Sequence, residues 1–206
     1  MNSQIKRIFF ERHIFYVYEE VYEPAEDTFL LARNLIVNEG ERVLDMGTGC
    51  GILAILATGK ASKVVAVDIN PQAIACTKKN AELNGVKAKI ETRLGNLFGA
   101  IETDEKFDII LFNAPYLPVE NDEGKSWIEK AWAGGKTGRK LIDQYIGKAP
   151  KHLAENGRIL LVQSSLSNIE TTLNRFSQHN LCTTIIAEEK SAFERIVLIE
   201  ARRQPF

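Results

Sequence analysis

Short apolar runs alternate with amphipathic stretches along most of this chain. A short apolar run between turn residues predicts a buried strand, whereas apolar residues three or four positions apart predict a helix. Asn70 suits a helix cap and Pro71 suits the first helical turn, so one helix start is marked clearly. The predicted strands span 42–46, 64–67, 88–92, 107–112, 158–162, 183–187 and 195–199, and the predicted helices span 24–36, 51–58, 70–84 and 138–155.

This alternation predicts an α/β fold. Repeated strand–helix units need a parallel sheet with helices on both faces, and right-handed crossovers make that sheet open and doubly wound. The short link 188–194 suits a hairpin, which adds one antiparallel strand near an edge. With 206 residues, we expect one domain, 1–206, with a short N-terminal extension at about 1–37.

The composition limits the partners of the protein. Hydrophobic residues make up 45% of the chain and charged residues 26%, which is typical of a globular protein. A formal net charge of −1 offers no positive field for nucleic acid. We find neither a secretory signal nor an apolar run that could cross a bilayer, and therefore expect a cytoplasmic protein without membrane contacts. The three cysteines and three histidines are scattered, which argues against a metal site.

A glycine-rich turn follows the first predicted strand. Gly47, Gly49 and Gly51 allow a ligand to approach the backbone closely, but their spacing differs from the G-x-G-x-x-G of dinucleotide sites. Asp45 precedes the turn, and its negative charge would repel a diphosphate and attract an ammonium group. S-adenosylmethionine carries an ammonium and a sulfonium but no phosphate. We therefore expect this cofactor rather than a dinucleotide.

Two polar residues follow the next strands. Asp68 ends the second strand, where a carboxylate can accept hydrogen bonds from ribose hydroxyls; the alternative is a helix-capping aspartate. Asn96 follows the third strand, where its amide could bind an adenine edge; the alternative is a turn asparagine. With the glycine turn, these residues predict a nucleoside-binding crevice.

The fourth predicted strand ends in Asn113-Ala114-Pro115-Tyr116. An amide nitrogen is a poor nucleophile, so an enzyme must hold its NH2 group in line with the methyl donor. The side-chain oxygen of Asn113 and the carbonyl of Ala114 are candidate acceptors for that group. Pro115 biases the backbone to an extended form, and Tyr116 can pack on a flat group. An ordinary turn is the alternative, but beside a cofactor strand the pattern predicts methyl transfer to a planar nitrogen.

With these features the chain resembles class I S-adenosylmethionine-dependent methyltransferases. More narrowly, it resembles the short archaeal and eukaryotic form of the HemK-like protein-(glutamine-N5) methyltransferases. The resemblance covers most of the chain, and the first and last of its matching segments are the most specific. These segments are Val21–Thr28, Asp45–Gly51, Asn113–Tyr116, and Ala131–Gly135 with Gly138, Arg139 and Asp143.

The resemblance implies a Rossmann-like seven-stranded sheet of order 3-2-1-4-5-7-6 whose last strand is antiparallel. It implies methylation of the glutamine in the Gly-Gly-Gln motif of a peptide-chain release factor, a modification linked to translation termination. Asn113, Pro115 and Tyr116 would surround that glutamine. The residues expected around the cofactor are Thr28, Asp45, Gly47, Gly49, Gly51, Asp68, Ile69, Asn96, Leu97 and Asn113.

The chain departs from the family pattern at two positions. Ala114 stands where the family usually has proline, which leaves the backbone carbonyl but makes the loop less rigid. Asn96 stands where the family usually has aspartate, and its amide retains an acceptor for an adenine amino group. Short relatives work with a small zinc-binding activator protein, so the resemblance also implies such a partner.

Three other functions remain open. An N6-adenine methyltransferase acting on DNA or RNA could hold an exocyclic amine with the same residues, Asn113–Tyr116 (the asparagine loop), after the base is flipped out. Basic residues and two tryptophans alternate between Lys125 and Lys140, as in nucleic-acid sites, although a solvated rim fits them equally well. The neutral charge and the absence of a target-recognition domain favour a protein substrate. The remaining alternatives are a nicotinamide oxidoreductase and a non-catalytic protein that only binds the cofactor.

Overall fold

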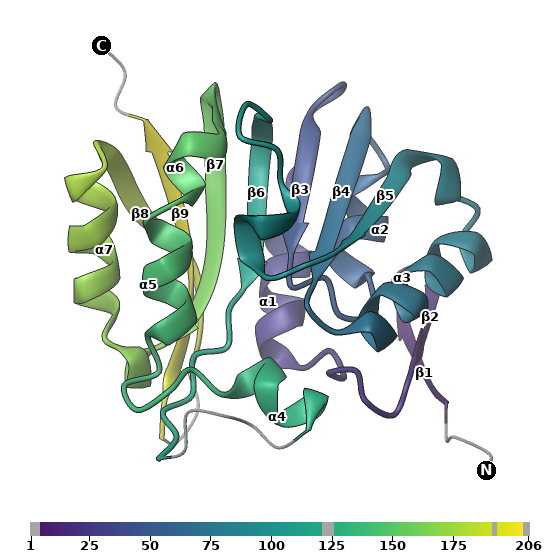
Figure 1. Cartoon of the computed structure of the whole chain (residues 1–206), viewed down its shortest axis with the longest axis horizontal. Coiled ribbons are helices and arrows are strands. Elements are labelled where there is room, and N and C mark those ends of the chain that lie inside the picture. Colours follow the sequence, from purple (N-terminus) through teal and green to yellow (C-terminus); the bar gives the residue numbers. More distant parts are fainter. Residues whose placement is uncertain (1–4, 121–125, 191–192, 204–206) are drawn as a thin grey trace.

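The computed structural model describes residues 5–120, 126–190 and 193–203, and a seven-stranded sheet forms its centre (Figure 1). The order β5-β4-β3-β6-β7-β9-β8 reads 3-2-1-4-5-7-6 when counting starts at β3, so the expected topology is confirmed. Strand β9 is antiparallel to both of its neighbours, whereas the other pairs in the sheet are parallel. The strands are β3 (Arg42–Met46), β4 (Lys63–Asp68), β5 (Ile90–Leu94), β6 (Phe107–Asn113), β7 (Leu153–Ser164), β8 (Leu181–Lys190) and β9 (Arg195–Arg203).

Helices cover both faces of this sheet. Figure 1 shows α5 and α7 in front of it and α1 and α2 behind it. Side chains on the central strands are therefore buried on both sides, as at Leu44, Ile110 and Leu160, and form one apolar core. The helices are α1 (Glu26–Asn34), α2 (Ile52–Ala57), α3 (Pro71–Leu83), α4 (Trp127–Trp132), α5 (Lys140–Ile146), α6 (Ala149–His152) and α7 (Ile169–Gln178).

The prediction of one helix over residues 138–155 was only partly correct. It contains two shorter helices, α5 and α6, and its last residues already belong to β7. Gly147 caps the first helix, and Pro150 stands at the start of the second, where its missing N–H is not needed. Helix α7 was not predicted, although Asn168 caps it by accepting a hydrogen bond from Thr171 N at 3.0 Å.

The N-terminal extension begins with a hairpin that was also not predicted. Strands β1 (Lys6–Phe10) and β2 (His13–Val17) pair with each other, and Phe15 and Val17 are buried. The side chain of Asn80 on α3 accepts from Tyr16 N and donates to Tyr16 O, both at 2.8 Å. These bonds attach the hairpin to α3 and so place the following segment near the sheet. Within the described ranges, the helices are too short or too polar to cross a membrane.

Candidate active site

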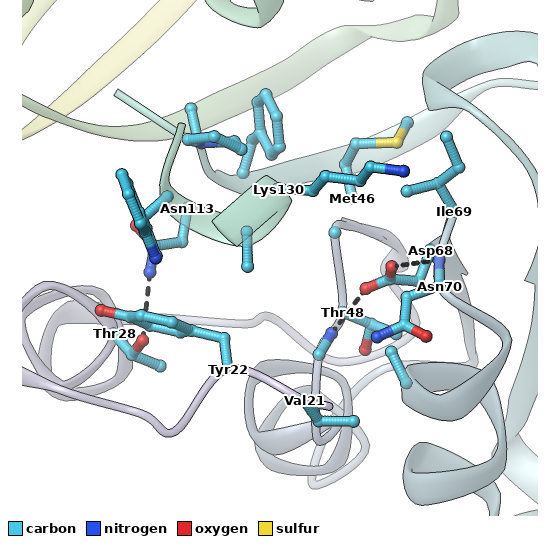
Figure 2. Close-up of a pocket in the computed structure, with 18 of the residues that line it drawn as sticks. Val21, Tyr22, Thr28, Met46, Thr48, Asp68, Ile69, Asn70, Asn113 and Lys130 are labelled. Atoms are coloured by element: carbon cyan, nitrogen blue, oxygen red, sulfur yellow. Dashed lines mark hydrogen bonds between the residues drawn. The ribbon is translucent and has the colours of Figure 1, made fainter. Parts of the chain in front are cut away.

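A cavity lies where β3, β4 and β6 end, between the N-terminal segment Val21–Thr28 and helix α4. Its empty space is about 1150 Å³ when the open solvent at its mouth is included. Figure 2 shows Asn113 and Thr28 on one side of this space and Asp68 and Asn70 on the other. The crevice therefore lies at the carboxyl ends of the strands, where doubly wound sheets bind ligands.

Two of the three predicted glycines border the cavity. Gly47 and Gly49 have φ angles of 68° and 57°, and a side chain on Gly49 would meet no atom of the chain within 4 Å. Gly51 does not border the cavity. Its φ is 85°, and a Cβ there would lie 2.8 Å from Thr77 Cγ2, so this glycine allows α2 and α3 to pack closely.

Helix α3 holds the carbonyl groups of the same turn. Thr77 Oγ1 donates to Gly49 O at 3.1 Å, and Asn80 Nδ2 donates to Cys50 O at 2.8 Å. Both side chains are fully buried. Sequence reasoning missed these two residues, because polar side chains on a helix give no sign of the loop that they contact.

Asp45 lies beneath the turn and does not border the cavity. Its Oδ2 accepts from Thr48 Oγ1 at 2.7 Å and from Ala54 N at 3.1 Å, and its Oδ1 has no partner among the described residues. Complete burial raises its pKa from 3.8 to about 7, although both hydrogen bonds act in the opposite direction. The structure therefore gives Asp45 a role in holding the turn, and its expected attraction for an ammonium group remains a prediction.

Asp68 joins the turn to the next helix. Its Oδ2 accepts from Gly49 N and its Oδ1 from Asn70 N, both at 2.9 Å (Figure 2). Each oxygen keeps acceptor capacity for a ligand hydroxyl. Burial raises the pKa of Asp68, and the hydrogen bonds from Asn70 and Gly49 oppose that effect.

Apolar side chains continue the wall beside Asp68. Ile69 borders the cavity and is 49% exposed, and Leu97 borders it as well. A flat base could pack against such side chains. Asn96 is exposed and does not border the cavity, although its neighbours Gly95 and Leu97 do. The structure thus brings Leu97, but not the Asn96 side chain, to the site.

Asn113 ends β6 and borders the cavity together with Ala114, Pro115 and Tyr116. Its Nδ2 donates to Thr28 Oγ1 at 3.0 Å (Figure 2). Its Oδ1 is buried without a hydrogen-bond partner in the described part of the chain. A buried acceptor without a partner is costly, so this oxygen suits the N–H of a bound ligand.

Asp27 organises the polar groups around Asn113. It is only 4% exposed, and its carboxylate accepts from the hydroxyls of Tyr22, Thr28 and Tyr116. Burial, followed by the charge of Asp27, raises the pKa of both tyrosines, so their hydroxyls remain protonated donors. The sequence placed Asp27 only near the positive end of a helix. It did not indicate the contact with Tyr116, because that contact joins segments far apart in the chain.

Helix α4 forms the remaining wall through Trp127, Lys130, Ala131 and Trp132. Trp127 N donates to Glu20 Oε2 at 3.0 Å, and the Lys130 ammonium lies 4.6 Å from the centre of the Trp127 ring. The predicted basic and aromatic segment is therefore partly a wall of the cavity. Its first residue, Lys125, lies outside the described residues.

The segment after α4 supports the asparagine loop. Gly134 N donates to Leu117 O at 2.8 Å, and a Cβ on Gly138 would lie 2.2 Å from Tyr116 O. Arg139 is buried and donates to Ser167 O at 2.6 Å, to Asn168 O at 2.8 Å and to Asp143 Oδ1 at 2.7 Å. The close approach of Tyr116 O explains why position 138 needs a glycine, and Arg139 joins the same segment to Ser167 and Asn168.

Together, these features fit S-adenosylmethionine. Asp68 could supply acceptors for ribose hydroxyls, Ile69 and Leu97 could supply an apolar surface for a base, and the open space at Gly49 could admit a ligand against the backbone. Asn113, whose side-chain oxygen has no hydrogen-bond partner among the described residues, lies on the opposite side of the same cavity.

Comparisons with known proteins agree with this geometry. A family model described as the methyltransferase small domain matches residues 24–191. A Methanocaldococcus jannaschii protein, provisionally named a protein N5-glutamine methyltransferase, is 40% identical over 91% of this chain and 94% of its own length. Human methyltransferase HEMK2 is 33% identical over 89% of this chain and 90% of its own length. A release factor glutamine methyltransferase from Geobacter sulfurreducens is 29% identical over 89% of this chain and 66% of its own length.

Solved structures share the fold at lower identity. The complex of E. cuniculi Mtq2 with Trm112, described as responsible for methylation of the translation termination factor eRF1, matches with a TM-score of 0.71. That match has 23% identity and covers 90% of this chain and 99% of the other. Methanocaldococcus jannaschii Trm5 in complex with adenosine matches with a TM-score of 0.71 and 20% identity, over 100% of this chain and 58% of the other. The sequence relatives and the family model together show that the chain belongs to the HemK-like S-adenosylmethionine-dependent methyltransferases of the small-domain family.

Proposed function

We propose that this methyltransferase acts on the N5 amide nitrogen of the glutamine in the Gly-Gly-Gln motif of a peptide-chain release factor. The observation that carries the proposal is the buried Oδ1 of Asn113, which has no hydrogen-bond partner in the described part of the chain and so suits the N–H of a planar amide. The names of the relatives support the same substrate class, since they include glutamine methyltransferases acting on release factors.

The residues of the loop would bind and orient the amide. Asn113 Oδ1 accepts one N–H of the glutamine, the Ala114 carbonyl accepts the other, and the ring of Tyr116 packs beside the amide plane. The cofactor supplies, when bound, an electrophilic sulfonium methyl group. Holding both N–H bonds orients the nitrogen lone pair toward that group, and the released proton passes to water. Such positioning needs no strong general base.

We propose a division of roles among the predicted cofactor residues. Gly47, Gly49, Asp68, Ile69 and Leu97 would contact the cofactor directly, as would Asn113 and Thr28 at the methyl end. Asp45 and Gly51 would act through the turn that they support, and Asn96 through its backbone. On this proposal residues 1–206 form a single catalytic domain, in which the extension 1–37 supplies Val21–Thr28.

Mass spectrometry of a release-factor domain incubated with the protein and S-adenosylmethionine tests the substrate. We expect one added methyl group on the glutamine, and no modification with Asn113→Ala. A release-factor domain with asparagine in place of that glutamine is the matched substrate control, because it keeps the amide but shortens its reach. Methyl transfer to DNA or RNA, with none to the protein, would overturn the proposal in favour of adenine N6.

We also propose that a small zinc-binding activator protein covers apolar surface at the β5 edge of the sheet. Among the described strands, β5 pairs only with β4, and Leu94 at its end is 59% exposed. The fold relative Mtq2 was solved as a complex with Trm112. Co-expression with candidate activators should raise activity and yield a stable heterodimer. A purified chain that is monomeric and fully active alone would contradict this partner.

A further inference from the structure

The carboxylate of Asp27 is a buried hydrogen-bond acceptor with several donors. Its Oδ1 accepts from Thr28 N at 2.6 Å and from Thr28 Oγ1 at 3.2 Å. Its Oδ2 accepts from Tyr22 Oη and Tyr116 Oη, both at 3.2 Å. A buried carboxylate requires such partners, and here they come from the N-terminal segment and from the asparagine loop. Asp27 therefore connects these two parts of the site.

The direction of these hydrogen bonds determines how the Asn113 amide is turned. A carboxylate only accepts hydrogen bonds, so the Thr28 hydroxyl must donate its proton to Asp27. Thr28 Oγ1 can then only accept from Asn113, and it does so from Nδ2 at 3.0 Å. The Asn113 oxygen is consequently directed away from Thr28, and it is the atom left without a partner in the described residues.

We propose that Asp27 is a positioning residue that acts through Thr28 to present Asn113 Oδ1, rather than Nδ2, to the substrate. The oxygen and the NH2 group of a carboxamide have nearly the same shape, so packing alone distinguishes the two orientations poorly. Only the correct orientation accepts the N–H of a glutamine amide. This inference rests on the proposed function, and it makes Asp27 a determinant of specificity for glutamine over glutamate.

Replacing the carboxylate by an amide should remove this control. In Asp27→Asn, the new NH2 group can donate to Thr28 Oγ1. The Thr28 hydroxyl can then donate its own hydrogen bond to Asn113 Oδ1. The Asn113 amide can then turn and present its NH2 group to the substrate. Two donors, the Asn113 NH2 group and the N–H of the glutamine amide, would then face each other. We expect kcat to fall about 10- to 100-fold, because an oriented hydrogen bond to the reacting group is lost.

Four variants test the proposal at saturating S-adenosylmethionine. Asp27→Asn and Thr28→Val break the chain of hydrogen bonds with little change in shape, whereas Thr28→Ser keeps the hydroxyl. Glu26→Gln is the matched control, since it makes the same carboxylate-to-amide change at the exposed neighbouring position. We expect Thr28→Ser to retain about ten times the kcat of Thr28→Val or more. Thermal unfolding and cofactor affinity, measured for each variant, identify any that fail to fold.

The decisive readout is the preference between two release-factor domains, one with the target glutamine and one with glutamate in its place. The glutamate form should inhibit the wild type weakly, because its carboxylate faces Asn113 Oδ1. The readout is the ratio of the inhibition constant of the glutamate form to the KM of the glutamine form. In Asp27→Asn and Thr28→Val, this ratio should be about tenfold lower than in the wild type. An unchanged preference, even with a lower kcat, would overturn the proposal, because a merely structural role predicts that result.

A second measurement does not depend on the substrate. The side-chain NH2 signals of Asn113, assigned by their loss in Asn113→Ala, report its hydrogen bond to Thr28 by nuclear magnetic resonance. We expect these signals to shift and exchange faster with solvent in Asp27→Asn and Thr28→Val, but not in Glu26→Gln. Wild-type protein that methylates no glutamine would refute the proposed function alone. Unchanged NH2 signals in both Asp27→Asn and Thr28→Val would refute the positioning role alone.

Discussion

The carboxylate of Asp68 accepts a hydrogen bond from the backbone N–H of Gly49 at 2.9 Å. This bond joins the end of β4 to the glycine turn after β3, and both residues border the same cavity. The side chain that is expected to bind ribose therefore also holds the backbone against which we propose that the cofactor lies. Changes at Asp68 should affect binding through both contacts.

We predict that cofactor affinity weakens as the pH falls through the pKa of Asp68. Burial raises that pKa, so protonation begins at a higher pH than for an ordinary aspartate, and the protonated group loses acceptor capacity. Titration calorimetry over a pH series should show this loss for the wild type and a flatter, weaker profile for Asp68→Asn. The exposed Asp104→Asn is the control and should follow the wild type. Parallel profiles for all three proteins would contradict the prediction.

A pair of glycine variants should separate folding from binding. Gly51→Ala forces a Cβ to within 2.8 Å of Thr77 at a φ of 85°, and we expect a loss of about 2–4 kcal/mol in unfolding free energy. Gly49→Ala carries similar backbone strain but meets no atom of the chain. It should cost about 1–2 kcal/mol and weaken cofactor binding as well. Urea unfolding and equilibrium dialysis measure the two effects, and the reverse ranking in stability would disprove the packing role of Gly51.

The support for the asparagine loop can be tested at Gly138. Its φ is 70°, and a Cβ there would lie 2.2 Å from the Tyr116 carbonyl oxygen. Gly138→Ala should therefore move the loop, lower the melting temperature and reduce kcat more than it changes cofactor affinity. Gly99→Ala, where a Cβ meets nothing within 4 Å, should leave all three values close to those of the wild type. Full activity in Gly138→Ala would show that this contact is not needed.

Asp45 should make the stability of the protein depend on pH. Its pKa is about 7 in the folded state and 3.8 as an ordinary value, so the folded protein binds more protons between these two values. The contribution of Asp45 to the unfolding free energy therefore falls as the pH rises from about 4 to about 7 and levels off above. Urea unfolding at several pH values should show this slope in the wild type and a smaller slope in Asp45→Asn. Equal slopes would rule out a buried, strongly perturbed carboxyl group.

Local signals were enough to predict much of the sheet and some helix boundaries. Strand β3 spans Arg42–Met46 as predicted, and Asn70 caps the helix that begins at Pro71. The hairpin β1–β2 gave no comparable signal, because its turn contains Glu11 at a φ of 50° instead of a glycine or an asparagine. Its stability comes from burial of Phe15 and from the bonds to Asn80, which are contacts with distant parts of the chain.

The candidate site followed the same division. The position of Asn113 at a strand end and the glycine spacing could be read from the sequence, and the structure places Asn113, Gly47 and Gly49, but not Gly51, at the cavity. The hydrogen bonds that orient the Asn113 amide could not be read from the sequence, because Thr28 lies 85 positions earlier in the chain. The structure likewise separates Asn96 from the cavity and keeps Leu97, because adjacent residues in a loop point in different directions.

The position of β9 between β7 and β8 has a consequence for synthesis on the ribosome. A nascent chain that stops before Arg195 has made β7 and β8 but lacks the strand that pairs with both. Each would then expose unpaired backbone groups, which invite association with other unfinished chains. Translational stalling in the last hairpin should therefore favour aggregation relative to release of the finished chain.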